Sequence, residues 1–121
     1  MLNVKTNLKC SNIHGVGLFA AEEIKKGTRV WEYNPETSII VNEILIKKYS
    51  FIEKYSWMTP EGKFVFDIDD SRHMNHSITP NIKMINGLYC EALTDIKIDE
   101  EITLDYKEIM SEDRWEDYFK C

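Results

Sequence analysis

The stretch IKMINGLYCEAL, residues 82–93, constrains the fold most, because it carries the strongest local signal in the chain. Apolar and polar residues alternate on either side of Asn86-Gly87, a pair that favours the positive φ angles of a tight hairpin turn. Two antiparallel strands are therefore expected here. Similar short stretches predict further strands at residues 2–8, 17–20, 28–33, 63–68 and 101–106. The sequence thus predicts a mainly β fold of short strands.

Two helices are expected beside these strands. Between residues 42 and 55 apolar side chains recur at helical spacing, and Asn42 is positioned as the N-cap. A second helix is expected over residues 111–119, where three aromatic side chains share one face: Trp115, Tyr118 and Phe119. The chain contains no strand–helix–strand unit, which argues against a Rossmann-type methyltransferase or dehydrogenase. Its length of 121 residues, without repeat or linker, predicts one domain over residues 1–121.

Charge and cysteine content narrow the classes of partner and compartment. The net charge is −6 at pH 7, whereas direct binding to nucleic acid requires clustered Lys and Arg. A basic protein or peptide is a better electrostatic match. The three cysteines are far apart, which fits a reducing compartment rather than a disulfide framework. The sequence has neither a signal-like N-terminus nor a run that could span a bilayer, so an intracellular location is expected.

The polar stretch RHMNHSITPN, residues 72–81, allows three interpretations. His73 and His76, with nearby aspartates, could ligate a metal, although the third histidine, His14, is remote in sequence. Ser77 beside His76 could be a nucleophile with its base, although no nucleophile-elbow glycines flank the serine. The third interpretation is a polar turn held in one shape by its own side chains. Such a turn is either a plain surface loop or a site for an organic ligand.

Two other motifs accompany this stretch. Gly15-Val16-Gly17 comes directly before an expected strand, where missing side chains allow either a bend or a close approach of the backbone to a ligand. DEEITLDY, residues 99–106, is an acidic turn followed by a short strand that ends at Tyr106. Each motif is weak evidence alone. Their order along the chain, with the hairpin between the last two, is much more specific.

In this order the motifs resemble the SET domain family of protein-lysine methyltransferases, over about residues 4–107. The resemblance rests on a GxG segment before a GLFA-like strand, on R-x-x-NHS-x-x-PN, and on EEIT-x-DY. It implies a β-clip fold whose last segment threads under a preceding loop, as in a pseudoknot. Ile78 stands where relatives often carry Cys, and no cysteine-rich pre-SET or post-SET segment is present. The chain therefore resembles a minimal SET domain.

The resemblance implies transfer of a methyl group from S-adenosylmethionine to a lysine ε-amine of a histone or another basic protein. It makes Tyr106 the catalytic residue. It assigns cofactor binding to Gly15, Val16, Gly17, Asn75, His76, Tyr106 and Trp115. It assigns the substrate channel to Leu104, Tyr118 and Phe119. His73 and Asn81 are expected to be structural, and no metal is expected, since the displacement needs no Lewis acid.

An alternative class stays open beside the enzyme: a non-catalytic peptide-binding module that has kept the SET scaffold. A lysine-bearing protein is the expected partner in both cases, without direct contact with nucleic acid or membrane. A homodimer is also open, and the location is expected to be cytoplasmic or at chromatin. The helix over residues 111–119 is expected to close the active site in place of a post-SET segment, and plain core packing of its aromatic side chains is the alternative.

Overall fold

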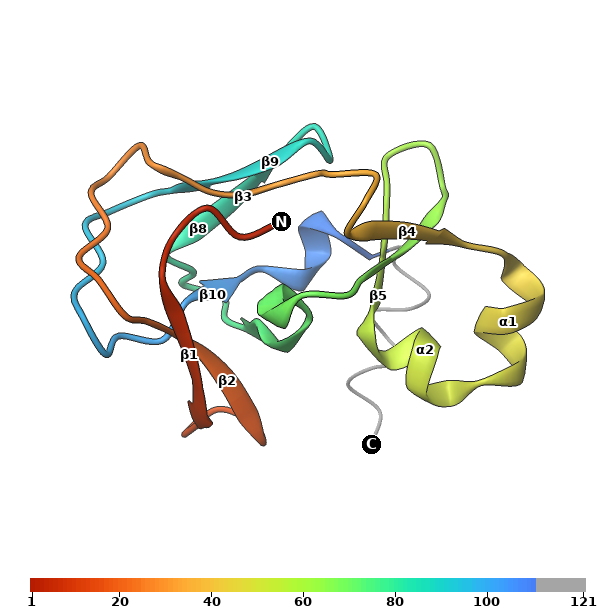
Figure 1. Ribbon diagram of the computed structural model, residues 1–121, viewed down its shortest axis with the longest axis horizontal. Helices are drawn as coiled ribbons and strands as arrows, with labels where there is room; N and C mark the ends of the chain where they lie inside the picture. The colour runs from red at the N-terminus through yellow and green to blue at the C-terminus, as the bar shows by residue number, and fades with distance from the viewer. Residues whose placement is uncertain (111–121) are drawn as a thin grey trace.

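The computed structural model describes residues 1–110 as a mainly β fold (Figure 1). The strands are β1 (Thr6–Cys10), β2 (Val16–Ala20), β3 (Arg29–Glu32), β4 (Ser38–Val41), β5 (Ser56–Met58), β6 (Phe64–Asp67), β7 (Asn75–His76), β8 (Ile82–Ile85), β9 (Tyr89–Ala92) and β10 (Thr103–Leu104). The helices are α1 (Glu43–Lys48) and α2 (Ser50–Tyr55), with 3-10 turns η1 (Asp70–His73) and η2 (Tyr106–Glu108). The predicted fold class is confirmed. The helix predicted over residues 111–119 lies outside the described residues.

The predicted hairpin is present as β8 and β9. The two strands pair antiparallel from Ile82–Ala92 to Ile85–Tyr89. Asn86 and Gly87 have φ angles of 53° and 70°, so both central residues of the turn adopt the left-handed conformation of a type I′ turn.

The internal helical segment is confirmed but is divided into two helices. Asn42 caps α1 as predicted, since its side chain accepts a 3.0 Å hydrogen bond from the Leu45 backbone N–H. Tyr49 then adopts an extended conformation, with φ −123° and ψ 103°, before α2 begins. Apolar spacing alone could not reveal this break, because it continues across Tyr49. The break redirects the chain so that β5 follows α2 directly and pairs with β6.

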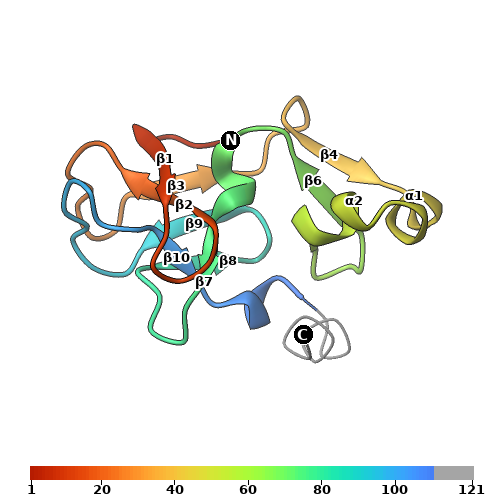
Figure 2. The ribbon, with the colours of Figure 1, turned by 90° about the horizontal axis from the view of Figure 1, so that it is seen from below.

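The strands form four small sheets, and three of these lie toward the two ends of the molecule. At one end, α1 and α2 accompany the sheet of order β4-β6-β5 (Figures 1 and 2). At the other end are the β1-β2 hairpin and the sheet of order β3-β9-β8. Trp31 of β3 packs edge-on against Trp57 of β5, with ring centroids 5.5 Å apart. This buried aromatic contact joins the two ends.

The C-terminal part of the described chain is inserted between segments that come much earlier. The Ile102 N–H donates to the Leu18 carbonyl of β2 at 2.8 Å. On its other side the same segment forms β10, which pairs in parallel with β7. The Asn81 side chain adds two bonds, accepting from the Thr103 N–H at 2.9 Å and donating to the Glu101 carbonyl at 2.8 Å. This arrangement agrees with the predicted threading, and with a structural role for Asn81.

The core is formed by aliphatic side chains at this crossing. Those with at most 2% exposure include Leu18, Ile24, Val30, Ile82, Ile96 and Ile102. They come from β2, β3, β8, the inserted segment before β10 and the two bridged residues Ile24 and Ile96, so the inserted segment is held by burial as well as by hydrogen bonds. Among the described residues, no helix is both long and apolar enough to cross a membrane.

The hairpin turn provides a test of the packing. In Gly87→Ala the new Cβ would lie 2.7 Å from Cδ of Pro60, at a φ of +70°. In Gly62→Ala, at a φ of +85°, the new Cβ would meet no atom of residues 1–110 within 4 Å. In Gly62→Ala the free energy of unfolding should therefore fall by about 1 to 2 kcal/mol, the cost of a left-handed backbone conformation at a residue with a side chain. In Gly87→Ala the free energy of unfolding should fall by roughly 2 to 4 kcal/mol, because overpacking against Pro60 adds to the backbone cost. Urea unfolding of both variants measures the difference, and equal losses would contradict the Pro60 contact.

Candidate functional site

The parallel pairing of β7 with β10 brings two of the sequence motifs together. Asn75 lies opposite Thr103, and His76 lies opposite Leu104. The Ser77 N–H continues the pairing by donating to the Leu104 carbonyl at 3.1 Å. Tyr106 follows two residues after Leu104, at the start of η2. The NHS stretch and the final DY pair thus occupy one place in the fold.

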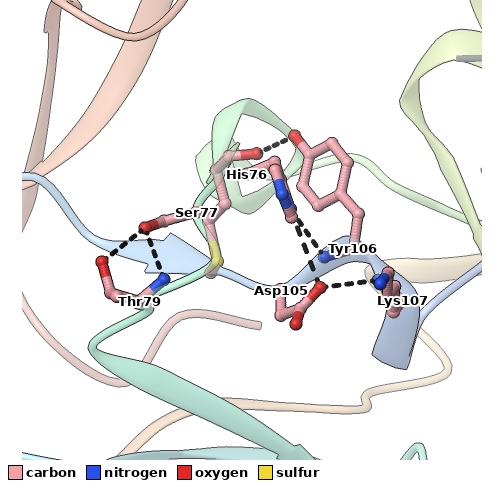
Figure 3. A network of polar contacts seen from close by, with 7 residues as sticks. His76, Ser77, Thr79, Asp105, Tyr106 and Lys107 are labelled. Atoms are coloured by element: carbon pink, nitrogen blue, oxygen red, sulfur yellow. Dashed lines mark hydrogen bonds and ion pairs between the residues drawn. The ribbon is translucent and has the colours of Figure 1, made fainter. Parts of the chain in front are cut away.

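His76 holds the backbone of Tyr106 through its imidazole. The Tyr106 N–H donates to Nδ1 of His76 at 3.1 Å, and the two rings lie 5.3 Å apart between centroids (Figure 3). Oδ1 of Asp105 is 3.8 Å from the same nitrogen and accepts from the Lys107 N–H at 3.0 Å. The Tyr106 hydroxyl donates to the Met74 carbonyl. Both ends of Tyr106 are therefore anchored to the segment that carries the NHS stretch.

Asn75 connects this segment to the glycine motif. It is 6% exposed, and its Nδ2 donates to the His14 carbonyl at 2.9 Å, to the Val16 carbonyl at 3.4 Å and to Oε2 of Glu101 at 2.9 Å. Within the described residues, its other side-chain atom, Oδ1, has no hydrogen-bond partner. The amide nitrogen therefore fixes the loop between β1 and β2, and the amide oxygen is left as an acceptor.

Two cavities meet at Tyr106. The first, here called the polar cavity, measures about 150 Å³. It is lined by His14, Gly15, Val16, Lys54, Tyr55, Arg72, His73, Met74, Asn75 and Tyr106. The second, here called the apolar cavity, measures about 60 Å³. Its lining is largely apolar and includes Trp31, Trp57, Met74, Met84, Leu104, Tyr106 and Ile109, but three charged residues, Lys54, Asp67 and Arg72, also line it.

The predicted site residues divide between these places. Gly15, Val16, Asn75 and Tyr106 line the polar cavity, and Leu104 lines the apolar one. Gly17 is buried beside the carboxylate of Glu101, and His76 contacts the site through Tyr106. The other predicted residues, Trp115, Tyr118 and Phe119, lie outside the described residues.

Several cavity residues were not expected from the sequence. Met74 and Tyr55 line both cavities, and Trp57 lines the apolar cavity. Met74 lies inside the polar stretch, where its position between His73 and Asn75 was a usable signal. Tyr55 and Trp57 come from the end of α2 and from β5, and no local pattern connects them to the other motifs.

The two rival interpretations of residues 72–81 find little support in the geometry. Across residues 1–110, no group of three His, Cys, Asp or Glu side chains is arranged to hold a metal ion. His73 packs edge-on against Tyr55 instead, with centroids 5.4 Å apart. The Ser77 hydroxyl accepts from the Thr79 N–H at 3.0 Å and lies 3.3 Å from the Thr79 hydroxyl (Figure 3), as in a polar turn.

Burial shifts the titration of the groups around the site. It lowers the pKa of His76 below its ordinary value of 6.5, although the Asp105 carboxylate acts in the opposite direction. It lowers the pKa of His73 as well. Burial raises the pKa of Asp67, whose carboxylate accepts from the Ser38 hydroxyl at 2.7 Å and from Nε1 of Trp57 at 2.8 Å. The neutral form of His76 is thus favoured, which its Nδ1 needs in order to accept from Tyr106.

The His76–Tyr106 contact should depend on pH. Because the pKa of His76 is lower in the folded chain than in the unfolded one, the unfolded chain takes up a proton first as the pH falls. The contribution of His76 to stability is thus retained above its ordinary pKa of 6.5. It is progressively lost as the pH falls through the folded pKa. In His76→Asn, an amide oxygen replaces the titrating acceptor.

Free energies of unfolding for wild type and His76→Asn, measured between about pH 7.5 and 5.5, test this dependence. The wild type should lose stability relative to the variant as the pH falls. The contributions of His73 and Asp67 to the pH dependence cancel in this comparison, because both proteins carry these residues. A difference that is constant, or that grows in favour of the wild type at low pH, would contradict the contact.

Comparison with known proteins identifies the family. The SET domain profile matches residues 15–107, which is most of the chain and includes all three motifs. The chain therefore belongs to the SET domain family. One similar protein is a curated protein of Plasmodium falciparum (isolate 3D7) named "Putative histone-lysine N-methyltransferase 1". The two are 32% identical over an alignment of 125 residues, gaps included, that covers 88% of this chain. The match spans only 2% of that protein's length.

Two solved structures share the fold. One is the crystal structure of a Plasmodium falciparum "putative histone methyltransferase", with a TM-score of 0.67 and 21% identity over 87% of this chain and 95% of that one. The other is a humanized mutant of the Chaetomium thermophilum Polycomb Repressive Complex 2 bound to the inhibitor GSK126. It has a TM-score of 0.67 and 26% identity, over 92% of this chain and 16% of that one.

Proposed function

We propose that this chain is a protein-lysine N-methyltransferase that uses S-adenosylmethionine. The observation that carries the proposal is the position of Tyr106 in the wall that the polar and apolar cavities share. A group transfer between two molecules needs two binding spaces that meet at the reacting atoms, and alignment there supplies much of the catalysis. The names of the relatives support the same activity.

The residues of the polar cavity fit the cofactor. Among the described residues, nothing lies within 4 Å of the Cβ position at Gly15, where φ is +46°, so a ligand can approach the backbone closely. The Asn75 amide oxygen is an acceptor suited to the ammonium of the cofactor's methionine part, and Val16 lines the same cavity. When bound, S-adenosylmethionine would supply a methyl group on a positively charged sulfur; a neutral amine takes that methyl group, and the sulfur leaves as a neutral thioether.

The apolar cavity favours the neutral form of the lysine that would accept the methyl group. A free lysine has a pKa of about 10.4 and is protonated at neutral pH. A lining of Trp57, Leu104 and Ile109 disfavours the ammonium and so lowers that pKa, and the proton leaves to water. The Tyr106 hydroxyl, oriented by the Met74 carbonyl, is then positioned between donor and amine.

The proposed substrate is a lysine in a histone or another basic protein. Both the net charge of −6 and the names of the relatives support a basic partner. Association with chromatin, and with partner chains as in the Polycomb complex, is part of the same proposal. A non-catalytic peptide-binding module is the alternative.

Tyr106→Phe should lower methyl transfer by about 100-fold or more, the loss typical of removing one preorganised polar group from an active site. The variant should stay folded, because the backbone bond to His76 does not involve the hydroxyl. Transfer from labelled S-adenosylmethionine to core histones and to a lysine-rich lysate fraction measures the effect.

Tyr89→Phe is the matched control. Tyr89 is similarly half-buried, on β9, with the Arg29 guanidinium 3.9 Å from its ring centroid, and it should keep full activity. Full activity of Tyr106→Phe would reject the role of the hydroxyl. Cofactor binding by calorimetry without transfer to any acceptor would favour the peptide-binding module, and the absence of binding would reject the proposal.

A further inference from the structure

The carboxylate of Glu101 lies where the three sequence motifs converge. It belongs to the inserted segment just before β10, and its backbone forms an antiparallel bridge with Phe19 of β2. Its side chain is half-buried and reaches toward the loop between β1 and β2. None of the lining of the polar cavity comes from Glu101 itself, so any effect on that cavity must act through other residues.

Two donors from separate parts of the chain meet at this carboxylate. The Ser11 hydroxyl donates to Oε1 at 2.8 Å, with Oε2 at 3.0 Å. Nδ2 of Asn75 donates to Oε2 at 2.9 Å. Hydrogen bonds to an ionised acceptor are stronger than those between neutral groups. The carboxylate therefore ties the end of β1 to the NHS stretch.

Ser11 transmits this contact to the backbone of the loop. Its hydroxyl oxygen accepts from the Ile13 N–H at 2.9 Å and from the His14 N–H at 3.3 Å. Its own N–H donates to the Gly15 carbonyl at 2.8 Å. The loop that carries the wall of the polar cavity is thus closed by Ser11, and Ser11 is in turn oriented by Glu101.

Gly17 permits the close approach on which this arrangement depends. A Cβ at Gly17 would lie 2.4 Å from Oε2 and 2.9 Å from Cδ of Glu101, and 3.0 Å from Cβ of Ser11. The carboxylate lies directly against the glycine, in the space that a side chain would fill. The second glycine of the motif therefore accommodates Glu101, whereas the first leaves the backbone open to a ligand.

We propose that Glu101 is a positioning residue that holds the glycine loop, through Ser11 and Asn75, in the conformation that binds the cofactor. This inference rests on the proposed function. The binding-competent conformation of a loop sets the apparent affinity, since affinity falls in proportion to the population of that conformation. Loss of the carboxylate should weaken cofactor binding and leave the chemistry at Tyr106 unchanged once the cofactor is bound.

The test compares Glu101→Ala with Glu101→Gln and Glu100→Ala. In Glu101→Ala, the dissociation constant for the demethylated cofactor should rise about tenfold or more, which corresponds to ~1.4 kcal/mol. The KM for S-adenosylmethionine should rise in parallel, with kcat nearly unchanged. Glu101→Gln keeps one acceptor for Asn75 and should be intermediate. The neighbouring Glu100 is exposed and its carboxylate approaches Asn81, so Glu100→Ala removes the same charge and should bind as wild type does.

A double-mutant cycle separates this role from a general loss of stability. If Ser11 and Glu101 act through one contact, Ser11→Ala should add little to Glu101→Ala, because the two effects are coupled. Urea unfolding confirms that each variant is folded under assay conditions. Wild-type affinity in Glu101→Ala, equal losses in Glu100→Ala, or a fall in kcat with an unchanged dissociation constant would each overturn the inference. A wild type that does not bind the cofactor would instead reject the proposed function.

Discussion

The parallel pairing of β7 with β10 is the constraint on which the candidate site depends. Two short strands bring Asn75 and His76 beside Thr103 and Leu104, although long stretches of chain separate the two motifs. So short a pairing forms few hydrogen bonds, whereas bringing the two strands together costs the conformational entropy of the chain that connects them. Burial adds the stabilisation that the pairing itself lacks, since Ile102, Thr103 and Leu104 are all at most 7% exposed. Hydrogen bonds from β2 and from Asn81 also hold the segment on both sides.

The sequence was sufficient to predict those parts of the structure that depend on local signals. Asn86-Gly87 specified its turn because both residues tolerate positive φ, and Asn42 specified a helix start because its side chain can accept a backbone N–H. The fold family was predicted from three motifs in order, since each motif fits a position that the fold requires. These are the parts of the structure for which residue type and spacing determine the conformation.

Contacts between distant segments could not be predicted in the same way. A two-residue strand such as β7 has no periodicity, and the extended conformation at Tyr49 leaves the helical spacing intact. The same is true at the site. Asn75 was expected to contact the cofactor, and the sequence could not show that its amide nitrogen also bonds the loop and Glu101. Tyr55 and Trp57 reach the cavities only because α2 and β5 fold back beside Tyr106.

The charges around Tyr106 bear on how a lysine would be deprotonated there. Arg72 lines both cavities and is held by bonds to the Ile68 and Asp69 carbonyls at 3.2 and 2.9 Å. A fixed cation disfavours a second cation nearby, so it adds to the effect of the apolar lining. Asp67 is the opposing group, but Ser38 and Trp57 each donate to one of its oxygens. Burial also raises its pKa, which weakens its ability to stabilise an ammonium. On the proposed function, the balance around the apolar cavity favours the neutral amine that methyl transfer requires.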